Sequence, residues 1–179
     1  MKHPRLPLAG CIVAALAALA RSAALAHGDA DVSPHDVREL VAQVRTATQP
    51  YRDVGTAVDA GYAQFLGCVA EPGRGAMGIH YLNGTLVSDA VVDPLKPEAL
   101  MYEPRPDGRL ELLGAEYIVF QAAWDALHPQ PPVLFGHPFH LVREPNRYGV
   151  PAFYELHLWL WRHNSGDLFD DWNPRVSCP

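Results

Sequence analysis

The chain has 179 residues, of which 49% are hydrophobic, and it carries 14 basic and 20 acidic side chains. This length suits one compact domain with a real hydrophobic core. The acidic balance argues against nucleic-acid binding, which needs a basic stripe, and against docking on an anionic membrane surface.

Residues 1–26 have the order of a secretory signal peptide. Lys2 and Arg5 precede a short apolar run, and small residues lead up to Ala26. We expect cleavage after Ala26, a secreted or periplasmic protein, and no stable membrane insertion afterwards. "LAGC", which ends at Cys11, resembles a lipoprotein cleavage box, but most of the apolar run follows it. Loss of Cys11 with the signal peptide is therefore favoured.

The expected mature chain, residues 27–179, is a single globular domain. It has 153 residues, with 11 basic and 20 acidic side chains and a formal charge of −9. Two cysteines remain, Cys68 and Cys178, and an exported chain most simply pairs them. Such a disulfide spans 110 positions and is worth about 4–5 kcal/mol in chain-entropy models. A zinc site on the two thiols is the alternative.

Two helices are predicted at the start of the mature domain. Ser33 can cap the first, over residues 33–48, with Pro34 at its first position and Asp36 in a capping box. Apolar residues then recur at helical spacing. A shorter helix is expected over residues 51–61, ending at a glycine.

Short apolar runs between prolines and glycines predict strands in the rest of the chain. The expected strands cover residues 63–70, 78–83, 99–104, 109–120 and 153–161. Asp107-Gly108 is a hairpin signal between the third and the fourth strand, and residues 120–127 suit a short helix. The predicted fold class is α+β, with the two N-terminal helices packed on a twisted antiparallel sheet or a small β-barrel.

The strand predicted over residues 153–161 is apolar on both faces, which indicates burial. Alternation places Glu155, His157, Trp159 and Trp161 on one face. A buried ionisable group needs an ion pair, a hydrogen bond or a metal.

Ionisable residues interrupt other apolar strands in the same way. His80, Glu103 and Glu116 each stand in a separate run. If these side chains converge with His157, they form a set of donors for zinc, iron, manganese or copper. We predict metal ligation by His80, Glu116 and His157. Each residue taken alone could instead be a hydrogen-bonded core residue, since no short ligand spacing such as HxH or HExxH links them.

Roles follow from this predicted metal site. An ion with an open position could activate water or dioxygen, with Glu103 and Glu116 as catalytic carboxylates. Tyr81, Trp159 and Trp161 would wall the pocket. Without a metal, Glu116 or Glu103 bonded to His157 would form an acid–base pair in a ligand pocket. We expect no nucleotide cofactor.

Other histidines are less informative. Pro138 predicts a loop around His137 and His140, where solvent exposure is favoured over a place in the site. An N-terminal His27 could form a copper brace with its own amine, although a frayed terminus is favoured. Residues 164–178 are expected to be structural turns.

Five segments resemble, in order, an uncharacterised family of small secreted bacterial proteins. These segments are "GCVAEPGRGAMGIHYLN", "DPLKPEALMYEP", "LLGAEYIVF", "LFGHPF" and "YELHLWLWRHNSGDLFDDWNPRVSC". The resemblance implies export and one domain, and it carries no established activity. It places His80, Glu103, Glu116, His157 and both cysteines within the family's motif segments.

Three functions fit these observations. The first is an exported metalloprotein that acts on a small organic molecule. The second is a non-catalytic binding module with an aromatic-lined polar pocket. The third is a structural domain whose core polar groups are paired. The sequence predicts neither the substrate nor the oligomeric state.

Overall fold

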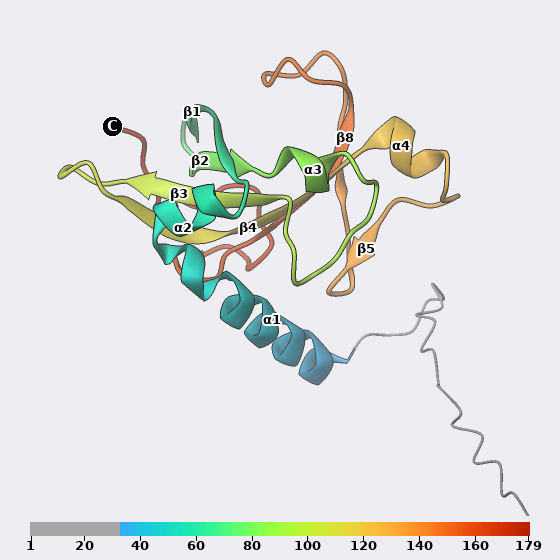
Figure 1. Cartoon of the computed structure of the whole chain (residues 1–179), viewed down its shortest axis with the longest axis horizontal. Coiled ribbons are helices and arrows are strands. Elements are labelled where there is room, and N and C mark those ends of the chain that lie inside the picture. Colours follow the sequence, from blue (N-terminus) through green and yellow to red (C-terminus); the bar gives the residue numbers. More distant parts are fainter. Residues whose placement is uncertain (1–32) are drawn as a thin grey trace, which may run out of the picture. The chain divides into compact units, whose positions relative to one another are not determined.

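A computed structural model describes residues 33–179 of the chain (Figure 1). The predicted signal peptide, Cys11 and His27 lie outside the described residues. The described part has an α+β fold built around one antiparallel sheet.

The sheet contains six strands in the order β1-β2-β3-β4-β8-β7, and each neighbouring pair is antiparallel. The strands are β1 (Ala63–Glu71), β2 (Gly75–Leu82), β3 (Ala99–Pro104), β4 (Leu110–Phe120), β7 (His140–Val142) and β8 (Phe153–Leu158). The sheet curls but stays open, because β1 and β7 form two separate edges. Of the two predicted shapes, the structure therefore has the sheet and not the closed barrel.

Helix α1 (Pro34–Thr48) begins at the predicted cap, where the Ser33 side chain accepts a hydrogen bond from the Asp36 amide. Its apolar face packs on β4 and β8, with Val44 fully buried in the same cluster as Tyr117 and Leu158. The short helices η1 (Gln49–Arg52) and α2 (Val54–Asp59) follow. Ala57 of α2 packs in a second cluster with residues of β3. We call this side of the sheet the helix face.

Four short elements complete the fold. Helix α3 (Gly84–Val87) follows β2, and helix α4 (Gln121–Asp125) follows β4. Strands β5 (Val133–Leu134) and β6 (His137–Pro138) pair as a separate two-stranded sheet. Within residues 33–179, no helix combines the length and the apolar character needed to cross a membrane.

The other side of the sheet, which we call the pocket face, carries the buried ionisable groups. Register sets their positions: Glu116 of β4 lies opposite His157 of β8, and Glu155 lies opposite His140 of β7. Because side chains alternate along a strand, these residues share one face, and Tyr117 and Leu156 point to the helix face.

The predicted disulfide is confirmed. Cys68 and Cys178 are bonded, with 5.6 Å between their Cα atoms. The C-terminal segment, residues 159–179 after β8, also forms a bridge between Asn173 and Ala76, and Val176 is buried beside Met101. The tail is therefore part of the core.

Strand β8 ends at Leu158, three residues before the predicted end. The amides of residues 160–162 all donate to the carbonyl of Leu113, so the chain turns there and leaves the ladder. The alternation that would place Trp161 on the pocket face does not extend this far.

Candidate metal centre

Three buried side chains meet on the pocket face, and we call them the inner group: His80, Glu116 and His157. Each comes from a different strand, β2, β4 and β8. Strand β3 separates β2 from β4, but it presents the small side chain of Ala99 opposite Glu116. His80 and Glu116 can therefore reach one another over β3. The residues predicted as metal ligands are brought together.

The inner group has the spacing of ligands around one ion. His80 Nε2 lies 3.3 Å from Glu116 Oε2, and His157 Nε2 lies 3.7 Å from Glu116 Oε1. One ligand atom from each residue lies within 4.8 Å of the others. Two atoms bound at ~2.1 Å to a tetrahedral ion stand about 3.4 Å apart. Small side-chain movements would complete such a geometry.

Three polar atoms of the inner group have no hydrogen-bond partner among the described residues. Both ring nitrogens of His157 and Oε2 of Glu116 are buried without a hydrogen-bond partner among residues 33–179. His157 is fully buried and Glu116 is 3% exposed. A buried polar atom without a partner costs about 1–3 kcal/mol, so it calls for an explanation. A cation bound within the inner group would supply a partner for Glu116 Oε2 and His157 Nε2.

Burial also shifts the pKa values of these groups, and with them their charges. Desolvation, with help from the charge on His157, lowers the pKa of His80 to about 3, so this imidazole is neutral with a free lone pair. Desolvation raises the pKa of Glu116 well above its usual value. Burial opposes protonation of His157, but Glu116, Asp171 and Glu155 outweigh it and raise its pKa to about 9. A divalent cation would displace the protons that Glu116 and His157 hold.

Asp171 approaches the inner group from the C-terminal segment. Its Oδ1 lies 3.6 Å from His157 Nδ1, on the opposite side of the ring from Glu116. The contact with His157 lowers the pKa of Asp171, although burial partly opposes this shift. The ring of His157 thus has Nδ1 turned towards Asp171 and Nε2 towards Glu116.

Asp171 belongs to a second set, which we call the outer group: His140, Glu155 and Asp171. His140 Nδ1 lies 3.5 Å from Glu155 Oε1 and 3.6 Å from Asp171 Oδ2. The contact with Glu155 raises the pKa of His140. The His140 side chain is 61% exposed, whereas Glu155 is buried. The outer group therefore lies between the inner group and solvent.

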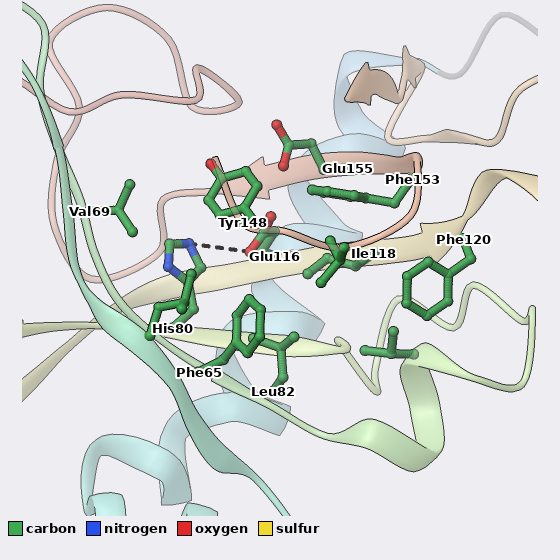
Figure 2. A pocket seen from close by; sticks show the side chains of 13 residues that line it. Phe65, Val69, His80, Leu82, Glu116, Ile118, Phe120, Tyr148, Phe153 and Glu155 are labelled. Atoms are coloured by element: carbon green, nitrogen blue, oxygen red, sulfur yellow. Dashed lines mark ion pairs between the residues drawn. The ribbon is translucent and has the colours of Figure 1, made fainter. Parts of the chain in front are cut away.

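An apolar cavity of about 160 Å³ adjoins the inner group. In Figure 2, His80 and Glu116 point towards one another at the cavity, with Tyr148 and Glu155 nearby. Its lining residues are Phe65, Leu66, Val69, His80, Leu82, Val87, Glu116, Ile118, Phe120, Tyr148, Val150, Phe153 and Glu155. An apolar cavity of about 150 Å³ is large enough for benzene.

The segment between β7 and β8, residues 143–152, helps to close this cavity. It contributes Tyr148 and Val150 to the lining. Arg147 of the same segment donates to Glu71 Oε2 at 3.0 Å, which ties it to the end of β1. The segment and β1 thus face each other across the cavity.

The predicted catalytic role of Glu103 is not supported by its position. Arg162 donates to Glu103 Oε2 at 2.6 Å, Arg105 lies 3.0 Å from the same oxygen, and the Ser177 amide donates to Oε1. Both carboxylate oxygens are therefore engaged away from the inner group, Oε2 by two arginines and Oε1 by a backbone amide. Glu103 anchors the C-terminal segment.

The three predicted wall residues have different positions. Trp159 lies beside His157, with ring centroids 6.4 Å apart, although it does not line the cavity. Tyr81 follows His80 directly, so it points to the helix face and packs on Tyr102. Trp161 lies on the helix side, beneath the guanidinium of Arg45 at 4.2 Å. Strand alternation explains why Tyr81 points away from the cavity, and the early end of β8 explains why Trp161 does.

Sequence reasoning missed three contributors to the site. Glu155 shares a face with His157 in the sequence, but nothing there linked it to His140. Asp171 falls in a segment interpreted as turns, and Tyr148 falls in an irregular segment. Only the strand order β4-β8-β7 and the return of the C-terminal segment place these residues together.

Comparison of this chain with family models, with curated proteins and with solved structures found no match. The resemblance to a secreted bacterial family stays a prediction.

Proposed function

We propose that this chain is a metalloprotein that binds a divalent transition metal through His80, Glu116 and His157. The observation that carries the proposal is the set of buried, unpartnered polar atoms on Glu116 and His157, beside the His80 nitrogen. Two imidazoles and one carboxylate are the donors of zinc hydrolases and of mononuclear Fe(II) oxygenases. Copper is the third candidate ion.

The second part of the proposal concerns the cavity. Three protein ligands leave a coordination position open, and an ion there can polarise a bound oxygen atom. His80 and Glu116 line the cavity, so the open position would face an apolar space of about 160 Å³. The expected ligand is a small molecule with an apolar body and one oxygen or nitrogen donor. Phenol is a suitable probe.

We also propose that the chain is exported, as its first 26 residues predict. The Cys68–Cys178 disulfide supports this proposal, because such bonds persist in oxidising compartments. Protein for the experiments below should therefore come, without a histidine tag, from an exported fraction, where its mass also reports the cleavage site.

Metal analysis of this protein tests the proposed centre. We expect about one tightly bound ion per chain in the wild type, and at least a tenfold weaker affinity in Glu116→Gln. Glutamine keeps the shape of the side chain but removes its charge. The matched control is Glu98→Gln, another buried glutamate outside both groups, and it should keep the ion. Circular dichroism checks that each variant is folded.

A cobalt(II)-loaded sample tests the open position. Phenol should change its visible absorption, and Val87→Phe, which fills the cavity, should abolish this change while the ion stays bound. Protein that binds no added zinc, copper or iron contradicts the metal centre. Phenol binding to such metal-free protein would support the second candidate, a binding module, which the apolar lining of the cavity favours.

A further inference from the structure

The outer group has the chemistry of a second cation site. His140 supplies a nitrogen, and Glu155 and Asp171 supply two carboxylates whose charges would balance a divalent ion. His140 Nδ1 stands 3.5 Å and 3.6 Å from the two carboxylate oxygens. These separations match the spacing expected around a single ion, about 3.4 Å for tetrahedral ligands.

A second observation, on Nδ1 of His157, concerns the same Asp171 carboxylate. Its Nδ1 atom is buried without a hydrogen-bond partner among the described residues, and it is directed at Asp171 of the outer group. The 3.6 Å separation from Asp171 Oδ1 is too long for a hydrogen bond. If Asp171 only oriented the ring, a charge-assisted bond of about 2.7–2.9 Å would be expected. A cation between them would fill this gap.

We propose that the outer group binds a second divalent cation and that the ring of His157 bridges the two ions. Nε2 would bind the inner ion and Nδ1 the outer ion. The bridging part of this inference depends on the inner ion proposed above, whereas the outer site does not. When both ions bind, His157 loses its ring protons to the solvent and becomes an imidazolate with a lone pair on each nitrogen.

The two sites would differ in how readily they release their ions. The inner ion is enclosed by residues that are at most 6% exposed, whereas the His140 side chain at the outer site is 61% exposed. The outer ion should therefore bind more weakly and leave first when a chelator is added. Because one ring contacts both ions, loss of the outer ion changes the electronic environment of the inner one.

Zinc titration of metal-stripped, full-length mature protein tests the second site. We expect two zinc ions per chain in the wild type and one in His140→Ala. His140 is an exposed residue, so its truncation should leave the fold intact. The matched control is His163→Ala, another exposed histidine whose side chain belongs to neither group, and it should keep two ions.

Copper(II) loading tests the bridge. Two copper(II) ions joined by one imidazolate couple magnetically, so the paramagnetic resonance signal per copper should fall well below that of an isolated ion. His140→Ala, with one copper, should recover the full signal. Full, uncoupled intensity from two bound coppers in the wild type would overturn the bridge.

The outcomes separate this inference from the proposed function. One zinc ion in both the wild type and His140→Ala overturns the outer site and leaves the inner centre in place. Two zinc ions in His140→Ala overturn the assignment of His140 as a ligand. One ion in the wild type that is lost in His140→Ala but kept in Glu116→Gln supports the outer site and overturns the inner centre.

Discussion

Glu98 is a buried carboxyl group outside the proposed metal centre, and it illustrates what burial does to a single residue. Its side chain is 1% exposed and accepts a hydrogen bond from the Ile118 amide at 3.0 Å. Desolvation raises its pKa to about 8, and the nearby charges of Asp89 and Asp93 add to the shift. Glu98 is therefore largely protonated at neutral pH.

This shift predicts a dependence of stability on pH. The folded-state pKa lies above the unfolded value near 4.5, so the stabilising contribution is complete below pH 4.5 and is lost as the pH rises through 8. Glu98→Gln keeps the acceptor for Ile118 but cannot ionise. At pH 9 its free energy of unfolding should exceed that of the wild type by a few kcal/mol, and at pH 5 the two should differ little.

Urea unfolding at both pH values measures this difference. Besides Asp89 and Asp93, two tyrosines interact with Glu98, namely Tyr62 and Tyr117, and burial raises the pKa of both, so they stay neutral across the range. An equal difference at pH 5 and pH 9 would contradict the assignment to Glu98, because the other groups that titrate in this range are present in both proteins and their contributions cancel in the difference.

At the level of residues, the sequence predicted the inner group and missed the outer one. His80, Glu116 and His157 stand out because each interrupts an apolar strand, and burial then demands a partner. Asp171 does not stand out in this way, because it lies in a polar segment and interrupts no apolar strand. Its role depends on where the C-terminal segment returns, which is set by tertiary packing.

Among the elements, the contact between β4 and the end of β8 depends on a glycine, Gly114, which has no side chain to hold the strands apart. A Cβ atom at Gly114 would lie 2.1 Å from the carbonyl oxygen of Leu158 and 3.1 Å from the Met101 methyl group. Gly114 stands two residues before Glu116, and Leu158 follows His157. The close approach of these strands therefore positions two of the proposed ligands, Glu116 and His157.

Gly114→Ala should push β8 away from β4. Overpacking of this kind costs about 1–3 kcal/mol, and the separation of Glu116 from His157 should weaken metal affinity as well. Chemical denaturation and metal titration measure the two effects. Gly84→Ala is the control, because a Cβ there meets no atom within 4 Å, and it should change neither quantity appreciably. If Gly114→Ala lowers stability but leaves metal affinity unchanged, the close contact at Gly114 stabilises the sheet without positioning Glu116 and His157.

Strand positions were more predictable than strand pairing. The runs expected over residues 99–104 and 109–120 correspond to β3 (Ala99–Pro104) and β4 (Leu110–Phe120), because apolar runs and the Asp107-Gly108 turn mark their ends. Strand β7, His140–Val142, is too short to give a periodic signal. Its pairing with β8, which brings His140 to Glu155, could not be predicted from local sequence.

For the whole molecule, the Cys68–Cys178 disulfide joins strand β1 to the C-terminal segment. Cys68 lies where the β1–β2 register shifts, between Phe65 and Val69, and both of those residues line the cavity. The tail contributes Asp171 to the outer group. One covalent bond thus links the cavity wall with the segment that carries a proposed ligand.

Replacement of both cysteines by serine should lower the free energy of unfolding by about 4–5 kcal/mol, because a crosslink over 110 positions restricts the unfolded chain. Urea unfolding of the oxidised wild type and of the double variant gives this difference. Equal transition midpoints for the two proteins would mean that the bond adds nothing to the stability supplied by the core.

The α+β class and the antiparallel sheet could be predicted from the lengths of the apolar runs and from the turns. Whether the sheet closes into a barrel could not. Whether a six-stranded sheet closes depends on long-range pairing between its edges, and here β1 and β7 stay apart. The same long-range geometry decides where the cavity lies. Local periodicity contains no information about either feature.

The three residues of the inner group come from β2, β4 and β8, so no short segment of the unfolded chain carries a complete set of donors. Small zinc-dependent domains hold their ion with closely spaced ligands and collapse without it. Here the sheet would have to assemble first, and an ion at the proposed centre would bind to ligands that are already in place. A chelator should therefore empty the centre without melting the protein, which would allow the occupant to be exchanged throughout the lifetime of the molecule.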